Sequence, residues 1–200
     1  MSTASDIRIP VHVLSQYVRL TKEHIRTLFG EDYVLTEIHR TAWSNEPIFA
    51  ETVNIKTETA EIPHLRIIGE NPKNSTVNLL KSGFRRLYSK EDETSTETEN
   101  TFGCLIQSTL GTVVLADGVR PIQRHVLLSQ AHAAELSLDE GQVISMHLKG
   151  TTNRTLHHFP VTPYSGSTSH LFLEPEEASA ATISESTRAS FGERTTAAKK

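Results

Sequence analysis

The hydrophobic positions of this chain fall mostly into short runs that alternate with polar residues or are rich in β-branched residues. Gly, Pro, Asn or Asp bounds most of these runs, which is typical of short β-strands. The Asp117-Gly118 pair between two runs also predicts a tight hairpin turn, because such turns need positive φ. We expect strands at Val11–Leu14, Glu51–Lys56, His64–Ile68, Thr76–Leu80, Gly103–Gln107, Thr112–Ala116, Val119–Ile122, Gln142–Leu148, Leu156–Val161 and Ser169–Leu173.

Two stretches follow a helical pattern instead. Residues Lys22–Phe29 and Gln130–Leu136 each carry one apolar face, and the hydroxyl residues Thr21 and Ser129 precede them as N-caps. A third short helix is expected after the Thr76–Leu80 strand, continuing through Leu87. The sequence therefore predicts a mainly β fold with short helices.

The two capped helices lie in an internal repeat. Residues 16–28 align with residues 124–136 at an offset of 108 residues, with identical pairs at Val18/Val126, Leu20/Leu128, His24/His132 and Leu28/Leu136. An internal duplication of this kind predicts two similar lobes. We place the first lobe at residues 1–88, an acidic flexible linker at 89–101, the second lobe at 102–181 and a disordered tail at 182–200, because both polar segments have little apolar surface to bury.

Composition removes several classes of function. The net charge is −4, with 20 basic against 24 acidic residues and no dense basic block, which argues against a nucleic-acid partner. A single cysteine, Cys104, excludes an internal disulfide and fits a reducing compartment, and its apolar surroundings predict a buried thiol. With no long apolar run and no signal-peptide core, the expected location is cytoplasmic, away from a membrane.

Several motifs in series resemble the PduL-type phosphate propanoyltransferases. The order and spacing of the matching segments hold from about residue 7 to residue 181. The matching segments are Ile9–Leu20, Ile48–Val53, Leu65–Gly69 with Ser75–Leu79, Asp117–Val119 with Gln123–Ser129, Ser137–Val143 and Phe172–Ala178.

This resemblance implies two pseudo-symmetric β-barrel lobes, in agreement with the repeat. It also implies conversion of acyl-CoA and phosphate to acyl phosphate and CoA at a pair of zinc ions. The family takes its zinc ligands from two His-x-His pairs, a strand Glu and a late His, and binds phosphate through an Arg. It further implies a homodimer or a subunit of a larger protein assembly.

Most of those ligand positions have changed in this chain. The first His-x-His pair reads Tyr17 and Arg19, and the second reads His125 and Leu127. The strand Glu reads Asn78, and the late His reads Phe172. Guanidinium, aliphatic and phenyl groups offer zinc no lone pair, so only His125 matches a family ligand. We therefore expect no bound zinc.

Three hypotheses follow for function. The leading one is a catalytically inactive family member that acts as a structural or assembly subunit. The first alternative is an active phosphate propanoyl- or acetyltransferase with a rearranged site, such as one built from His12, His125 and His170. The second alternative is a module that binds CoA or another anion through Arg19, Lys73 and Arg124, where Lys73 lies beside the position of the family's phosphate Arg.

Overall fold

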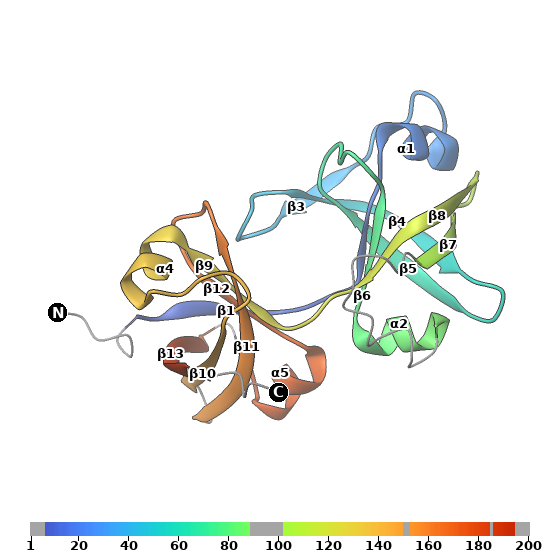
Figure 1. Ribbon diagram of the computed structural model, residues 1–200. Coiled ribbons are helices and arrows are strands. Elements are labelled where there is room, and N and C mark those ends of the chain that lie inside the picture. The colour runs from blue at the N-terminus through green and yellow to red at the C-terminus, as the bar shows by residue number, and fades with distance from the viewer. Residues whose placement is uncertain (1–6, 89–101, 150–152, 185, 195–200) are drawn as a thin grey trace. The chain divides into compact units, whose positions relative to one another are not determined.

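The computed structural model describes residues 7–88, 102–149, 153–184 and 186–194 (Figure 1). The chain divides into two compact units. One unit, which we call the first barrel, is Ser15–Ile122. The other, which we call the second barrel, combines Met1–Leu14 with Gln123–Lys200.

The first barrel closes with six strands. In the order β4-β5-β2-β6-β8-β7 each strand pairs with the next, and β4 pairs with β7 to close the ring, while a seventh strand, β3, pairs with β4 alone among the described strands. Its elements are β2 (Tyr17–Arg19), α1 (Lys22–Phe29), β3 (Glu37–Arg40), β4 (Pro47–Lys56), β5 (Glu61–Ile68), β6 (Thr76–Leu79), α2 (Lys81–Leu87), β7 (Phe102–Gln107) and β8 (Thr112–Pro121).

The second barrel also closes with six strands, in the order β1-β12-β9-β11-β10-β13. Closing a sheet in this way leaves no strand edge exposed. Its elements are β1 (Ile9–Val13), β9 (His125–Ser129), α4 (Gln130–Leu136), β10 (Val143–Lys149), β11 (Arg154–Tyr164), β12 (His170–Leu173), α5 (Pro175–Ala180) and β13 (Arg188–Arg194).

The two barrels have the same ladder of strands. In the first barrel β2 pairs in parallel with β5 and antiparallel with β6, and in the second β9 pairs in parallel with β11 and antiparallel with β12. The strands β6 and β8 pair in parallel, as do β12 and β1. The prediction of a mainly β fold with two pseudo-symmetric barrels is therefore confirmed.

The compact units differ from the predicted lobes of residues 1–88 and 102–181. The N-terminal strand β1 belongs to the second barrel, where it pairs with β12 and β13, and β7 and β8 belong to the first barrel. The first barrel thus takes β7 and β8 from the segment that precedes the second repeat, and the second barrel takes β1 from the segment that precedes the first. An alignment of the repeats cannot reveal this exchange, because it is a property of strand pairing and not of sequence order.

The predicted disordered tail contains a strand. Within residues 182–200, β13 (Arg188–Arg194) pairs with β1 and β10, and Ala189 and Phe191 are buried. Among the described residues of the tail, Ala189 and Phe191 are the buried apolar side chains, so its apolar content was too low to predict a strand. The predicted acidic linker, 89–101, lies outside the described residues.

The predicted hairpin at Asp117-Gly118 is wrong. The strand β8 runs through both residues, and the turn that joins β7 to β8 lies at Ser108–Gly111. Between the pairs Phe102↔Val119 and Cys104↔Leu115 the strand β8 carries extra residues, which form a bulge. Gly118 has φ of 111°, so the Asp-Gly signal for positive φ was correct but marks a bulge and not a turn.

The predicted helices are confirmed, with α1 and α4 at the expected bounds and α2 ending at Leu87. Each barrel has its own apolar core, including Phe84 in the first and Phe159 in the second, both fully buried. Cys104 is buried as expected, and burial raises the pKa of its thiol to about 12. None of the helices in the described part of the chain is long and apolar enough to cross a membrane.

Candidate functional site

Three residues form a row across the first barrel. Tyr17 on β2 lies opposite Asn78 on β6, and Asn78 lies opposite Arg120 on β8. Tyr17 and Asn78 are half-buried, and Arg120 is exposed. The structure thus brings together two of the residues expected from the family resemblance and adds Arg120, which the sequence analysis did not single out. We call these three residues the first-barrel row.

An equivalent row crosses the second barrel. Phe172 on β12 lies opposite His125 on β9 and opposite His12 on β1. The Phe172 ring stacks on that of His125, with centroids 4.7 Å apart, and on that of His12 at 5.2 Å. Phe172 is 3% exposed, so the two imidazoles flank a buried phenyl ring. We call these three residues the second-barrel row.

The two rows correspond to each other through the duplication. The repeat offset places Tyr17 on His125 and His12 on Arg120. Asn78 and Phe172 occupy the middle strand in each barrel, β6 and β12. The same offset, extended upstream from the aligned helices, would have identified Arg120 from sequence as the counterpart of His12. The rows therefore mark one ancestral position that now carries different chemistry in each copy.

Arg19 lies two residues after Tyr17 along β2, and Leu127 lies two residues after His125 along β9. Arg19 forms a bidentate ion pair with Glu46, in which Nη2 donates to Oε2 at 2.6 Å. This hydrogen bond is the largest cause of the raised pKa of Arg19 and of the lowered pKa of Glu46. Leu127 lies opposite His170 on β12. In this structure the guanidinium of Arg19 is therefore already matched by a carboxylate.

Arg124, the other arginine expected to bind an anion, is engaged in the same way. It pairs with Glu177 of α5 and donates through Nη2 to the carbonyl of His157 at 2.7 Å. Its guanidinium also lies over the ring of Phe159, 4.6 Å from the centroid. Lys73, the third expected residue, is exposed. Two of the three cations predicted for an anion site thus have carboxylate partners within their own barrel.

Burial favours the neutral form of three imidazoles in the second barrel, those of His12, His125 and His170. Nε2 of His12 lies 3.0 Å from Nδ1 of His170, and Nδ1 of His125 donates to the carbonyl of Gln123 at 2.9 Å. Burial, followed by the nearby His170, lowers the pKa of His12 to about 4. Burial also lowers the pKa of His125 and of His170. The lowered pKa values favour the neutral form of all three imidazoles at neutral pH.

The residues at the family's metal positions do not fit a zinc site. Tyr17, Asn78, Leu127 and Phe172 offer at best a phenol or an amide, and Arg19 brings a positive charge. The hypothetical rebuilt site also lacks a common centre, because Phe172 lies between His125 and His12. In the residues for which positions are given, no three His, Cys, Asp or Glu side chains could together hold a metal ion.

The repeated histidines on the helices have a structural role that the sequence analysis did not find. In the first barrel Ser75 Oγ accepts from the backbone N–H of the cap residue Thr21 and lies 2.8 Å from Nδ1 of His24. In the second barrel Ser169 Oγ makes the same contacts with Ser129 and His132, at 2.9 and 2.7 Å. Each Ser–His pair ties a helix start to a neighbouring strand. This arrangement explains why the cap residue and the histidine have the same spacing in both copies of the repeat.

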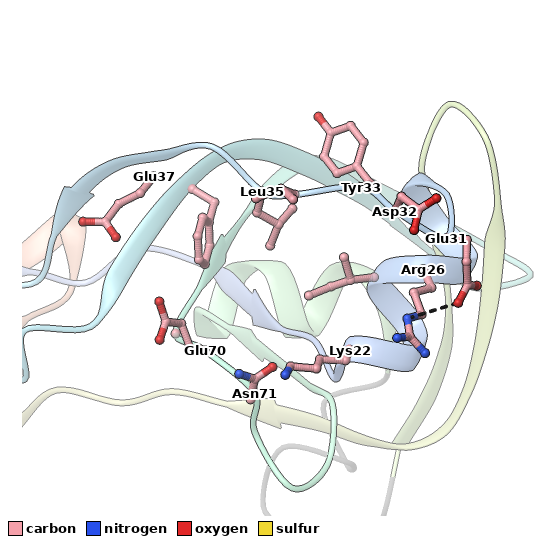
Figure 2. A pocket seen from close by; sticks show the side chains of 13 residues that line it. Lys22, Arg26, Glu31, Asp32, Tyr33, Leu35, Glu37, Glu70 and Asn71 are labelled. Atoms are coloured by element: carbon pink, nitrogen blue, oxygen red, sulfur yellow. Dashed lines mark ion pairs between the residues drawn. The ribbon is translucent and has the colours of Figure 1, made fainter.

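A cavity of about 520 Å³ lies in the first barrel beside α1, and none of the residues of the first-barrel row lines it (Figure 2). Ile25, Leu35 and Phe49 supply apolar walls, and the charged Lys22 and Glu70 also line the cavity. None of the six family-site positions lines this cavity.

Comparison with known proteins identifies the family. A family model described as phosphate propanoyltransferase matches residues 10–184. The phosphate propanoyltransferase of Lachnoclostridium phytofermentans is 24% identical over 177 residues, covering 88% of this chain and 83% of the relative. Those of Planctopirus limnophila and Thermotoga maritima are 25% and 26% identical, covering 89% and 74% of this chain and 74% and 71% of the respective relative. The chain belongs to the phosphate propanoyltransferase family.

Proposed function

We propose that this chain is a member of the family that has lost zinc-dependent acyl transfer and serves as a structural subunit of a homodimer or larger assembly. The observation that carries the proposal is the second-barrel row. There, the position of the family's late histidine holds Phe172, which is buried between His125 and His12. A phenyl ring at that point cannot donate to a metal and also separates the two neighbouring imidazoles.

The other family positions support the same proposal. Zinc polarises a carbonyl only when several donors hold it with one coordination position open to substrate. Here Arg19 satisfies Glu46, and Asn78 donates to the hydroxyl of Thr76 at 3.2 Å. These side chains stabilise the barrel that contains them. A scaffold whose former site residues bind neighbouring side chains keeps its shape without a metal.

The test is an assay of acyl transfer between propionyl-CoA and phosphate. The purified chain is supplied with zinc and compared with the phosphate propanoyltransferase of Lachnoclostridium phytofermentans under identical conditions. We expect release of CoA by the relative and only background release by this chain. Zinc-dependent turnover by this chain at a rate comparable to that of the relative would overturn the proposal.

A second candidate is a binding module for CoA or another anion. The observation in its favour is Arg120, which is exposed at the end of the first-barrel row and forms no ion pair with any residue of the described ranges. The ion pairs of Arg19 and Arg124 with glutamates weigh against it. A CoA-dependent rise in the unfolding temperature that is lost in Arg120→Gln, without turnover, would favour this candidate. The active enzyme with a rearranged site is the outcome in which the assay shows turnover.

A further inference from the structure

The strand β3 distinguishes the first barrel from its duplicate. In the second barrel α4 leads directly to β10, whereas in the first barrel β3 is inserted between α1 and β4 (Figure 1). The strand is not needed to close the barrel, because β4 pairs with both β5 and β7. Since the duplicate folds the same ladder without it, closure of the barrel does not explain why β3 is present.

The outer edge of β3 is open. Among the described strands β3 pairs with β4 only, and all four of its residues are exposed. An open edge presents backbone N–H and C=O groups that can pair with a further strand. Apolar side chains accompany this edge, since Ile38 is 53% exposed and Val34, in the segment that leads into β3, is 82% exposed. The edge thus combines unpaired backbone with exposed apolar surface.

The charges of β3 are self-complementary. The strand reads Glu37-Ile38-His39-Arg40, and Glu37 and Arg40 lie on one side of it, where Oε2 of the first accepts from Nη2 of the second at 2.7 Å. If two copies pair antiparallel about a two-fold axis between Ile38 and His39, each Glu37 lies opposite the Arg40 of the other copy. Opposite charges at directly facing positions stabilise such a pair, and a two-fold axis repeats the contact.

We infer that β3 is the surface through which a second copy of this chain binds, by antiparallel pairing of the two β3 edges. This inference deepens the proposed role as a structural subunit and rests on it. The strand is short and contains a bulge between Glu37 and His39, so the interface is small and the dimer is weak and reversible. Pairing also brings the exposed Val34 and Ile38 of both copies toward protein instead of water.

Sedimentation velocity of the wild-type chain and of two single variants, Arg40→Glu and Glu37→Arg, tests this inference. We expect the wild type to dimerise as its concentration rises from about 1 µM to several hundred µM, a range that brackets weak association. Each single variant places like charges opposite each other in a homodimer, so each is expected to remain monomeric. An equimolar mixture restores a Glu–Arg match at both ends and is expected to form a heterodimer.

The mixture separates association from internal stability. Both single variants lose the ion pair between Glu37 and Arg40 within the chain, and mixing does not restore it, so renewed association can come only from contacts between chains. The matched control is Arg154→Glu on β11, which reverses an exposed arginine in the second barrel and should dimerise like the wild type. Thermal unfolding of each variant verifies that it is folded.

Three outcomes would overturn the inference. They are a wild type that stays monomeric at every concentration, single variants that dimerise as well as the wild type, and a mixture that stays monomeric although the wild type dimerises. The first would mean that the β3 edge is free or binds a different protein. The proposed loss of acyl transfer is tested separately, since turnover is measured on the wild type whatever its oligomeric state.

Discussion

The two barrels share a fold but not the chemistry of their rows. Both use the same six-strand ladder and the same Ser–His pair at a helix start. The first-barrel row is Tyr17, Asn78 and Arg120, whereas the second-barrel row is His125, Phe172 and His12. The comparison teaches that the strand pairing and the helix caps are alike in the two copies, whereas the residues of the two rows have diverged.

The largest expected effect comes from the two cores. Phe84→Ala in the first barrel and Phe159→Ala in the second each remove a fully buried ring, and each should lower the free energy of unfolding by about 3–5 kcal/mol. Because each barrel has its own core, each substitution should shift the unfolding of its own barrel. Denaturant titration followed by NMR signals from both barrels measures this. Val114→Ala, at an exposed position, is the control and should change stability by less than about 0.5 kcal/mol.

The next largest effect concerns the ion pairs. Arg19→Met leaves Glu46 partly buried without its strongest donor, and Arg124→Met does the same to Glu177, so each should cost about 1–3 kcal/mol at pH 7. The lowered pKa of Glu46 means that its contribution is present above the pKa of the unfolded carboxyl and is lost as the pH falls through the folded pKa. Arg19→Met should therefore remove part of the acid dependence of stability. Equal acid dependence in wild type and variant would contradict this.

The Ser–His pairs should have matching effects in the two barrels. Ser75→Ala and Ser169→Ala each leave a cap N–H without its acceptor, and both serines are buried, so each is expected to cost about 1–2 kcal/mol. Unfolding free energies of the two variants measure the match. A cost in one barrel and none in the other would show that the duplicated contact is used differently.

The smallest effect at neutral pH is the titration of His12. Its lowered pKa, about 4, means that the native state resists a proton which the unfolded chain accepts near pH 6.5. Stability should be fully present above that pH and should fall as the pH drops from about 6.5 to about 4. NMR titration of the His12 ring follows this directly, with His12→Gln expected to flatten the decline. A midpoint near 6.5 for His12 would contradict the buried contact with His170.

The sequence predicted the parts of the fold that depend on local pattern. Caps at Thr21 and Ser129, the repeat and the mainly β character were all correct because capping and alternation act over a few residues. It failed where pairing over long distances decides. The membership of β1 in the second barrel, the strand β13 and the bulge at Gly118 depend on which strands meet. At the site, the family positions were found, and the repeat offset, extended upstream, also pairs Arg120 with His12. The stacking of Phe172 between two imidazoles could be seen only from the strand pairing.

The central proposal, that the family's metal positions no longer hold zinc, is tested most directly by the zinc content of the purified wild-type chain. Protein prepared with zinc in the medium and dialysed against zinc-free buffer is analysed by mass spectrometry, beside the Lachnoclostridium phytofermentans relative. We predict far less than one zinc per chain, because Tyr17, Asn78 and Phe172 stand where the family has zinc ligands. Two tightly bound zinc ions per chain would contradict the account.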